Sequence, residues 1–159
     1  MTDFRKLVDA LAVARVDFVL IGGVALVLQG SSRTTADIDI CYSRDRDNLE
    51  RLVKALAPLA PSVRGAPPEL PFAWDAQTLQ SGLNFPLHTQ AGDIDLMGEV
   101  VGVGDYAALT RDAGMFDVYG HKVRVMSLNA LERAKRAAGR AKDLLDLAEI
   151  AEIRKRSRR

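Results

Sequence analysis

Two aspartates are the first residues in this chain whose spacing could do chemistry. Asp37 and Asp39 alternate with Ile38 and Ile40 in the stretch DIDICYS, residues 37–43. Alternation with a period of two predicts a β-strand, on which both carboxylates project from one face about 6.5–7 Å apart. At that separation they repel each other by about 2–3 kcal/mol at an effective dielectric constant of about 20. A sheet face open to water would tolerate this pair, and a site for divalent cations would use it.

A second stretch repeats the pattern. GDIDLMG, residues 92–98, carries Asp93 and Asp95 in the same alternation. A second acidic strand beside the first would gather three or four carboxylates, whose repulsion divalent cations offset. Hard oxygen ligands favour Mg²⁺, and two ions about 3.5–4 Å apart support phosphoryl transfer. Periodicity alone does not choose between Asp93 and Asp95.

The two histidines argue against zinc. His88 and His121 fall in different expected elements, and each is interpreted as a surface or hairpin residue rather than a metal ligand.

A glycine pair precedes the first acids. Gly22 and Gly23 follow an apolar run and open a predicted helix. Residues without Cβ let a phosphate approach the backbone amides, although a tight turn would also explain the pair. No third glycine follows in dinucleotide-fold spacing, and no Gly-Lys-Ser/Thr follows either, which excludes the Rossmann and P-loop motifs.

The elements that must position these residues alternate between helix and strand periodicity. Helices are predicted at 3–16, 22–30, 46–60 and 104–113, and Ser127 caps a helical region to 153 that breaks near Gly139. Strands are predicted at 17–21, 37–43, 83–90 and 92–100, with a hairpin at 115–127 turning at Gly120-His121 and a proline-rich loop at 61–75. This order predicts an α/β (α+β) fold with a single mixed sheet and flanking helices.

Composition limits the class of protein. The chain has 159 residues with a net charge of +1, which suits one domain and excludes a globally basic nucleic-acid binder. We expect a single domain over 1–153 and a basic C-terminal tail, RKRSRR, over 154–159, either frayed and solvated or in contact with RNA. The single cysteine and the absence of an apolar leader or membrane-length apolar run predict a cytoplasmic protein with no membrane contact.

The combined pattern resembles the nucleotidyltransferase superfamily related to DNA polymerase beta. Thirteen residues separate Gly23 from Asp37, and Arg33 and Thr35 fit the arrangement Arg-x-Thr-x-Asp-x-Asp found in many members. The resemblance spans roughly residues 15–150. It points to the small bacterial branch with the lincosamide nucleotidyltransferases and the AbiEii-like and minimal nucleotidyltransferases of toxin–antitoxin operons. It therefore implies the nucleotidyltransferase fold.

The resemblance also implies roles for single residues. Gly22 and Gly23 would lie against the triphosphate of a nucleoside triphosphate, and Asp37 and Asp39 would hold two Mg²⁺ ions. The family pattern Gly-x-apolar-Asp-apolar selects Asp95 as the third metal ligand and as the acceptor of the hydroxyl proton.

Cations complete the implied site. Lys135 is the main candidate for a triphosphate contact, followed by Arg140 and Lys142, although a solvated helix face is the alternative for all three. Arg33 would either reach a phosphate or pair with a neighbouring aspartate.

The expected function is Mg²⁺-dependent transfer of a nucleoside monophosphate to an acceptor hydroxyl, with release of pyrophosphate. The acceptor stays open between a small molecule, a protein side chain and an RNA end, because the chain lacks the added helical domain of AbiEii-like toxins. The alternative is a non-catalytic or antitoxin-like module that binds a protein toxin or RNA. A third hypothesis is a structural domain whose acids face solvent.

Overall fold

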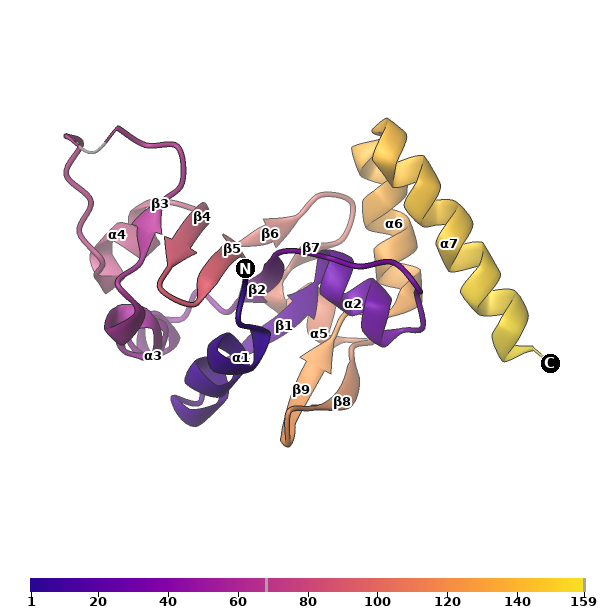
Figure 1. Ribbon diagram of the computed structural model, residues 1–159, viewed down its shortest axis with the longest axis horizontal. Helices are drawn as coiled ribbons and strands as arrows, with labels where there is room; N and C mark the ends of the chain where they lie inside the picture. The colour runs from indigo at the N-terminus through magenta and orange to yellow at the C-terminus, as the bar shows by residue number, and fades with distance from the viewer. Residues whose placement is uncertain (68, 159) are drawn as a thin grey trace.

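A seven-stranded mixed sheet forms the centre of the molecule (Figure 1). The computed structural model describes residues 1–67 and 69–158. The strands follow the order β3 (Ser62–Val63), β4 (Asn84–Thr89), β5 (Gly92–Met97), β2 (Ile38–Tyr42), β1 (Phe18–Ile21), β9 (His121–Val125) and β8 (Gly114–Val118). A separate small pair joins β6 (Glu99–Val100) to β7 (Gly104–Asp105). The expected mixed sheet with flanking helices is confirmed.

The centre of the sheet is covered on both faces. All four residues of β1 are buried, and four of the five residues of β2 are buried, with Asp39 the half-exposed exception. β2 pairs with β5 in parallel and with β1 in antiparallel orientation. Because side chains alternate along a strand, this parallel register brings acids on β2 and β5 to one face.

Helices pack around the sheet and against each other (Figure 1). They are α1 (Phe4–Val13), α2 (Gly22–Leu28), α3 (Arg46–Leu56), a 3-10 turn (Ala57–Leu59), α4 (Ala76–Ser81), α5 (Tyr106–Thr110), α6 (Leu128–Ala138) and α7 (Ala141–Ser157). α1 packs on α3, α3 on α4, and α6 on α7. No helix in the described ranges is long and apolar enough to cross a membrane.

The start and the end of α6 have the helix cap and the glycine stop that the sequence predicts. The Ser127 hydroxyl accepts a hydrogen bond from the Ala130 amide and caps α6. Gly139 then adopts φ +64°, a left-handed conformation that ends the helix. The expected break at Gly139 is therefore found as a stop between two helices.

Several expected boundaries are wrong. The strand predicted at 37–43 begins at Ile38, so Asp37 lies on a bend just before β2. The region after residue 60 contains β3 and α4, which short-range patterns did not indicate; Pro68 of the predicted loop lies outside the described residues. The predicted strand 92–100 divides into β5 and β6, and the predicted helix 104–113 divides into β7 and α5. The hairpin turns at Tyr119-Gly120, both with positive φ, rather than at Gly120-His121.

The basic segment is also different from a frayed end. α7 continues through Arg154, Lys155, Arg156 and Ser157 without a break at 153, and Arg159 lies outside the described residues. The Arg154 guanidinium pairs with Glu132 and Asn129 on α6, and Arg156 donates a hydrogen bond to the Gly30 carbonyl. These arginines hold α7 in place.

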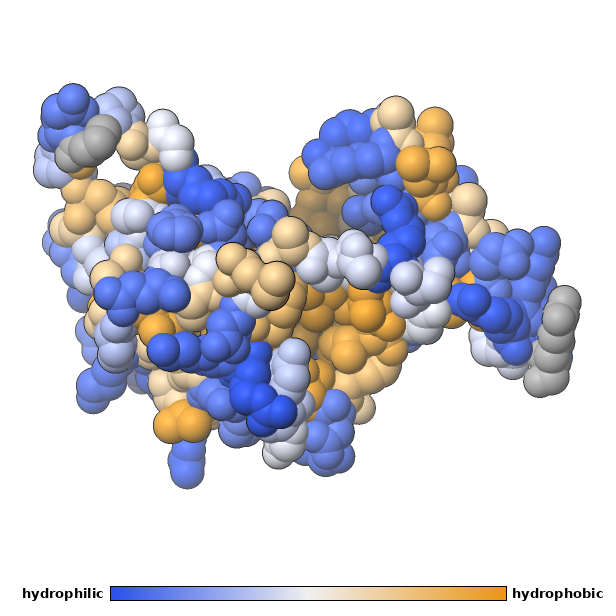
Figure 2. Space-filling model, viewed as in Figure 1, coloured by the Kyte–Doolittle hydropathy of each residue, from blue (hydrophilic) through white to orange (hydrophobic). Residues whose placement is uncertain are grey.

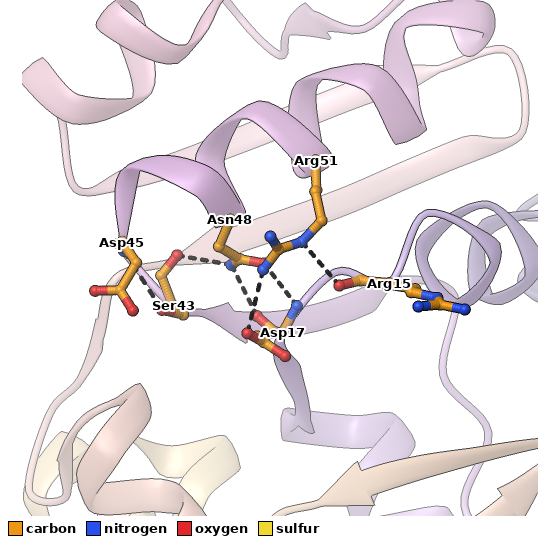
Figure 3. Close-up of polar contacts among 6 residues, drawn as sticks. All are labelled: Arg15, Asp17, Ser43, Asp45, Asn48 and Arg51. Atoms are coloured by element: carbon orange, nitrogen blue, oxygen red, sulfur yellow. Dashed lines mark hydrogen bonds and ion pairs between the residues drawn. The ribbon is translucent and has the colours of Figure 1, made fainter.

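One buried amide joins α3 to the sheet (Figure 3). The Asn48 side chain is fully buried. Its Oδ1 accepts from the Asp17 amide at 2.7 Å, and its Nδ2 donates to the Asp17 and Ser43 carbonyls at 3.0 and 2.8 Å. This residue therefore ties together the chain before β1, the chain after β2 and helix α3.

We predict that Asn48→Leu destabilises the protein by about 2–4 kcal/mol, because it leaves buried polar backbone groups without partners at nearly constant volume. Urea unfolding followed by circular dichroism measures the loss. Glu50→Gln, an exposed change on the same helix, should stay within about 0.5 kcal/mol of wild type. Equal stability of the two variants would contradict this role of Asn48.

Candidate active site

The predicted acids meet where β2 runs beside β5. Asp39 on β2 is the Cα partner of Asp95 on β5. Neighbouring strands lie about 4.8 Å apart, so the two carboxylates stand next to each other on one face. Asp37 lies two residues before Asp39 and borders the same cavity. The register therefore turns two separate sequence motifs into one acidic cluster.

Asp39 is the most perturbed acid of this cluster. Burial, the neighbouring charge of Asp95 with a hydrogen bond to it, and the charge of Asp37 together raise the pKa of Asp39 to about 7, against a smaller opposing effect of Lys135. Its Oδ1 atom is buried and has no hydrogen-bond partner among the described residues. A buried carboxylate oxygen without a partner costs free energy, which a bound cation would recover.

The glycine pair makes room for this carboxylate. Gly22 has φ +65°, and a Cβ placed there would overlap Asp39 Oδ2. A Cβ on Gly23 would lie 2.8 Å from Thr35 Oγ1. Both glycines are therefore required by close approach of the acid and of the loop before β2, and they leave bare backbone beside the acids.

The predicted cations lie opposite the acids, and Arg33, Lys135 and Arg140 each pair with an acid of α7. Lys135 Nζ lies 2.9 Å from Asp146 and 3.5 Å from Asp143, and Arg33 also pairs with Asp146. Arg140 Nε lies 2.8 Å from Asp143. The Asp143 side chain has no exposed surface, and its hydrogen bonds with Arg140 lower its pKa to about 2. The partner of Arg33 is not a neighbouring aspartate but Asp146, 113 positions away in the sequence, and a phosphate contact of Arg33 stays a prediction.

A further cation touches the third acid. Arg64, just after β3, donates from Nη2 to Asp95 and from Nη1 to the Leu87 carbonyl at 2.8 Å. Asp93, the alternative to Asp95, lies 2.7 Å from His88 Nδ1, and its Oδ2 lies 3.9 Å from Arg64 Nε. Of the two, Asp95 borders the cavity that Asp37 and Asp39 line, and its role as the third metal ligand stays a prediction.

All nine predicted site residues line one cavity of about 330 Å³. They are Gly22, Gly23, Arg33, Asp37, Asp39, Asp95, Lys135, Arg140 and Lys142. Its charged side chains balance, with the acids Asp37, Asp39, Asp95 and Asp146 against the bases Arg33, Lys135, Arg140 and Lys142. That these residues bind a nucleotide or a metal stays a prediction.

The donor set suits a hard cation. The three acids offer only carboxylate oxygens, and Asp39 Oδ1 lacks a partner, which fits Mg²⁺. Among residues 1–67 and 69–158, no group of three Asp, Glu, Cys or His side chains is arranged so that it could already hold a metal ion. Arg64 occupies Asp95, so an ion bound there would compete with this ion pair.

Sequence reasoning missed three residues of the site. Asp143 and Asp146 stand one helical turn apart at the start of α7, a spacing that indicates a shared face but not its partners. Arg64 comes from the proline-rich region and reaches Asp95 through the pairing of β3 with β4, which no local pattern signals.

A mixed sheet that places acids from two adjacent strands beside a glycine-opened helix, with a cationic helix opposite, defines the nucleotidyltransferase class of folds. The chain belongs to the family described as "Nucleotidyltransferase of unknown function (DUF6036)", whose model matches residues 3–86. No curated protein matches it by sequence.

Solved structures share the fold at low identity. The lincosamide antibiotic adenylyltransferase LnuA, bound to lincomycin, has a TM-score of 0.60 at 18% identity over 96% of this chain and 98% of its own. ANT(2″)-Ia, in complex with adenylyl-2″-tobramycin, has 0.55 at 16% identity over 96% and 95%. TM1012 from Thermotoga maritima, assigned to the nucleotidyltransferases, has 0.58 at 21% identity over 93% and 89%. At these identities the likeness shows the fold alone.

We predict that Asp39→Asn stabilises the metal-free protein at pH 8 by about 2–4 kcal/mol relative to its effect at pH 4. Because the folded pKa of Asp39 lies near 7, above the value of 3.8 for a free carboxyl, the folded state keeps a proton that the unfolded state releases. Stability from this group is thus lost as pH rises from about 4 to 7. Urea titrations in EDTA, with exposed Glu69→Gln as control, measure the difference; a pH-independent effect would refute it.

We predict that Arg64→Gln destabilises the protein by about 1–2 kcal/mol at pH 8, because it removes the cation from Asp95 inside an acidic cluster. Thermal unfolding at pH 8 measures the loss. Arg46→Gln, which breaks an exposed pair with Glu50, is the matched control and should cost about 0.5 kcal/mol or less. Similar losses for both arginines would contradict a special role of Arg64.

Proposed function

We propose that the protein is a magnesium-dependent nucleotidyltransferase, which transfers a nucleoside monophosphate from a nucleoside triphosphate to an acceptor hydroxyl and releases pyrophosphate. The observation that carries this proposal is the single cavity lined by the three acids, the glycine pair and the four cations. Membership of a nucleotidyltransferase family supports the reaction class.

The balance of charged side chains in the cavity supports the proposal that the reaction needs a metal ion. The cavity already holds four acids and four bases. Arg33 and Lys135 pair with Asp146, and Asp95 and Arg140 pair with residues outside this set, Arg64 and Asp143. A polyphosphate entering it would add negative charge that the paired side chains cannot neutralise. Asp37, Asp39 and Asp95 would hold the Mg²⁺, which when bound polarises phosphate oxygens and offsets charge on the leaving group.

The cations opposite the acids would hold the phosphates. Lys135 and Arg33 share Asp146 as partner, at the cavity edge, and its side chain is only 15% exposed. Phosphate oxygens offer the same charge and hydrogen-bond acceptors as this carboxylate, so a triphosphate would take its place. Lys142, which lines the cavity beside them, adds a further positive charge.

Asp95 would accept the proton of the acceptor hydroxyl. It stands beside Asp39 at the edge of the cavity nearer to β4, where Arg64 contacts it. A carboxylate can act as the proton acceptor in such a step, and Arg64 holds this carboxylate in position through their hydrogen bond.

Small hydroxylated molecules are the first acceptors to test, because two proteins of the same fold are described with lincomycin and with adenylylated tobramycin. Protein side chains and RNA ends are the other acceptors to include. The alternative, an antitoxin-like module, depended on a basic C-terminal tail that is free to bind RNA. Arg154 and Arg156 instead contact other parts of the chain, which does not favour this alternative.

We predict that Asp37→Asn, Asp39→Asn and Asp95→Asn each lower transfer at least about 100-fold while the protein stays folded. The assay incubates each protein with Mg²⁺, an α-³²P-labelled nucleoside triphosphate and fractionated cell lysate, and follows labelled product and pyrophosphate. EDTA should abolish the signal.

Asp93→Asn is the matched control, since Asp93 has the same residue type on the same strand but pairs with His88. Its activity should stay within about threefold of wild type, because Asp93 does not line the cavity. Loss of activity in Asp93→Asn with retention in Asp95→Asn would overturn the assignment of the third acid. Wild-type protein that neither binds nor turns over any of the four Mg-nucleotides would overturn the proposed function.

A further inference from the structure

A second cavity of about 340 Å³ adjoins the acidic one and differs from it in chemistry. Its apolar lining comes from β1, the end of β5, the β6 turn, the residue after β9 and one face of α6. These side chains are Ile21, Met97, Val100, Val101, Met126, Leu131, Ala134 and Ala138. Figure 2 shows a notch between the sheet and the α6–α7 pair with hydrophobic surface on its α6 side.

The two cavities share one wall. Gly22, Asp39, Lys135 and Arg140 line both of them. Of the two cavities, the polar one contains Asp95, Arg33 and Lys142. The apolar cavity therefore opens at Asp39 and Lys135, on the side of the acidic cluster away from Asp95 and its partner Arg64.

We propose that the apolar cavity holds the nucleoside of the nucleoside triphosphate, and that it does so without reading the edge of the base. This inference rests on the proposed function, because it assumes that the α-phosphate is placed at the acids.

The geometry of phosphoryl transfer favours the nucleoside over the acceptor. The attacking hydroxyl and the leaving pyrophosphate must lie on opposite sides of the α-phosphate. The polar cavity supplies both sides, with Asp95 to receive the hydroxyl proton and with Arg33 and Lys142 for the pyrophosphate. The remaining substituent of the α-phosphate is the nucleoside, and the cavity that starts at Asp39 and Lys135 is where it can go.

The lining predicts weak discrimination between bases. The charged side chains of the apolar cavity are Asp39, Lys135, Arg140 and Asp143, of which three lie on the shared wall and Asp143 is fully buried and paired. The remaining lining side chains have no hydrogen-bond donor or acceptor other than the weak thioether sulfurs of Met97 and Met126. A site that hydrogen-bonds its substrate discriminates by about 10⁴-fold or more, whereas an apolar pocket achieves about 10–200-fold.

Two measurements test this inference on the full chain. The first compares binding of Mg-ATP, Mg-GTP, Mg-CTP and Mg-UTP by calorimetry. ATP and GTP, which differ at the base edge but not in size, should bind within about tenfold of each other, a difference below about 1.4 kcal/mol. A preference above about 1,000-fold for one of them would overturn the claim that the base edge is not read.

The second measurement blocks the cavity. Ala138→Phe, at an exposed position of α6 that lines it, should weaken Mg-ATP binding at least about tenfold and leave Mg-tripolyphosphate binding within about twofold. Val101→Phe, in the turn after β6 and 69% exposed, should do the same. Ala151→Phe, at an exposed alanine of α7 away from both cavities, is the matched control and should change neither.

The outcomes separate this inference from the proposed function. Normal ATP binding with loss of transfer in both blocked variants would assign the cavity to the acceptor and overturn the inference. Equal loss of ATP and tripolyphosphate binding would also overturn it, since the polyphosphate alone should not enter the apolar cavity. Wild-type protein that binds neither ligand would instead contradict the proposed function itself.

Discussion

The repulsion among the carboxylates at the junction of β2 and β5 is the constraint on which the rest of the site depends. The register pairs Asp39 with Asp95, and Asp37 follows the same face. Burial makes the charge of Asp39 costly enough to raise its pKa to about 7. A sheet built for stability alone would place apolar or neutral residues here, because buried like charges oppose folding.

The residues around the carboxylates reduce this repulsion or leave space for the carboxylates. Arg64 neutralises Asp95 from the β3–β4 edge, and Lys135 faces Asp39 from α6. Gly22 gives the Asp39 carboxylate the space that a side chain would occupy. One acid oxygen, Asp39 Oδ1, is still without a partner in the described part of the chain. The compensation by protein groups is thus incomplete at this carboxylate oxygen.

Short-range patterns predicted the acids and glycines well because their signals are local. The alternation around Asp39 and around Asp95 marks two strands, and Gly22-Gly23 marks the start of a helix. The selection of Asp95 over Asp93 needed the family pattern, since both residues share one strand face. The Ser127 cap and the Gly139 stop were predictable for the same local reason.

The features that the sequence did not predict depend on contacts between residues that are far apart in the chain. Arg64 reaches an acid 31 positions away only because β3 adds to the edge of β4. β3 has two residues and α4 has six, too short for a periodic signal. The partners of Asp143 and Asp146 depend on the angle between α6 and α7 across Gly139, which no residue type specifies.

α7 connects these features, because it contributes to the site at one end and to the fold at the other. Near its start, Asp143 and Asp146 hold Lys135, Arg140 and Arg33 in place. Towards its end, Arg154 pairs with Glu132 on α6 and Arg156 bonds the Gly30 carbonyl after α2.

The basic C-terminal residues therefore act on the cavity indirectly, by fixing the helix that carries its acids. A ligand that displaced Asp146 from Lys135 and Arg33 would remove contacts between α7 and both α6 and the loop before β2, while the contacts of Arg154 and Arg156 would remain. In that case the far end of α7 would still be anchored to α6 and to the residue Gly30 after α2.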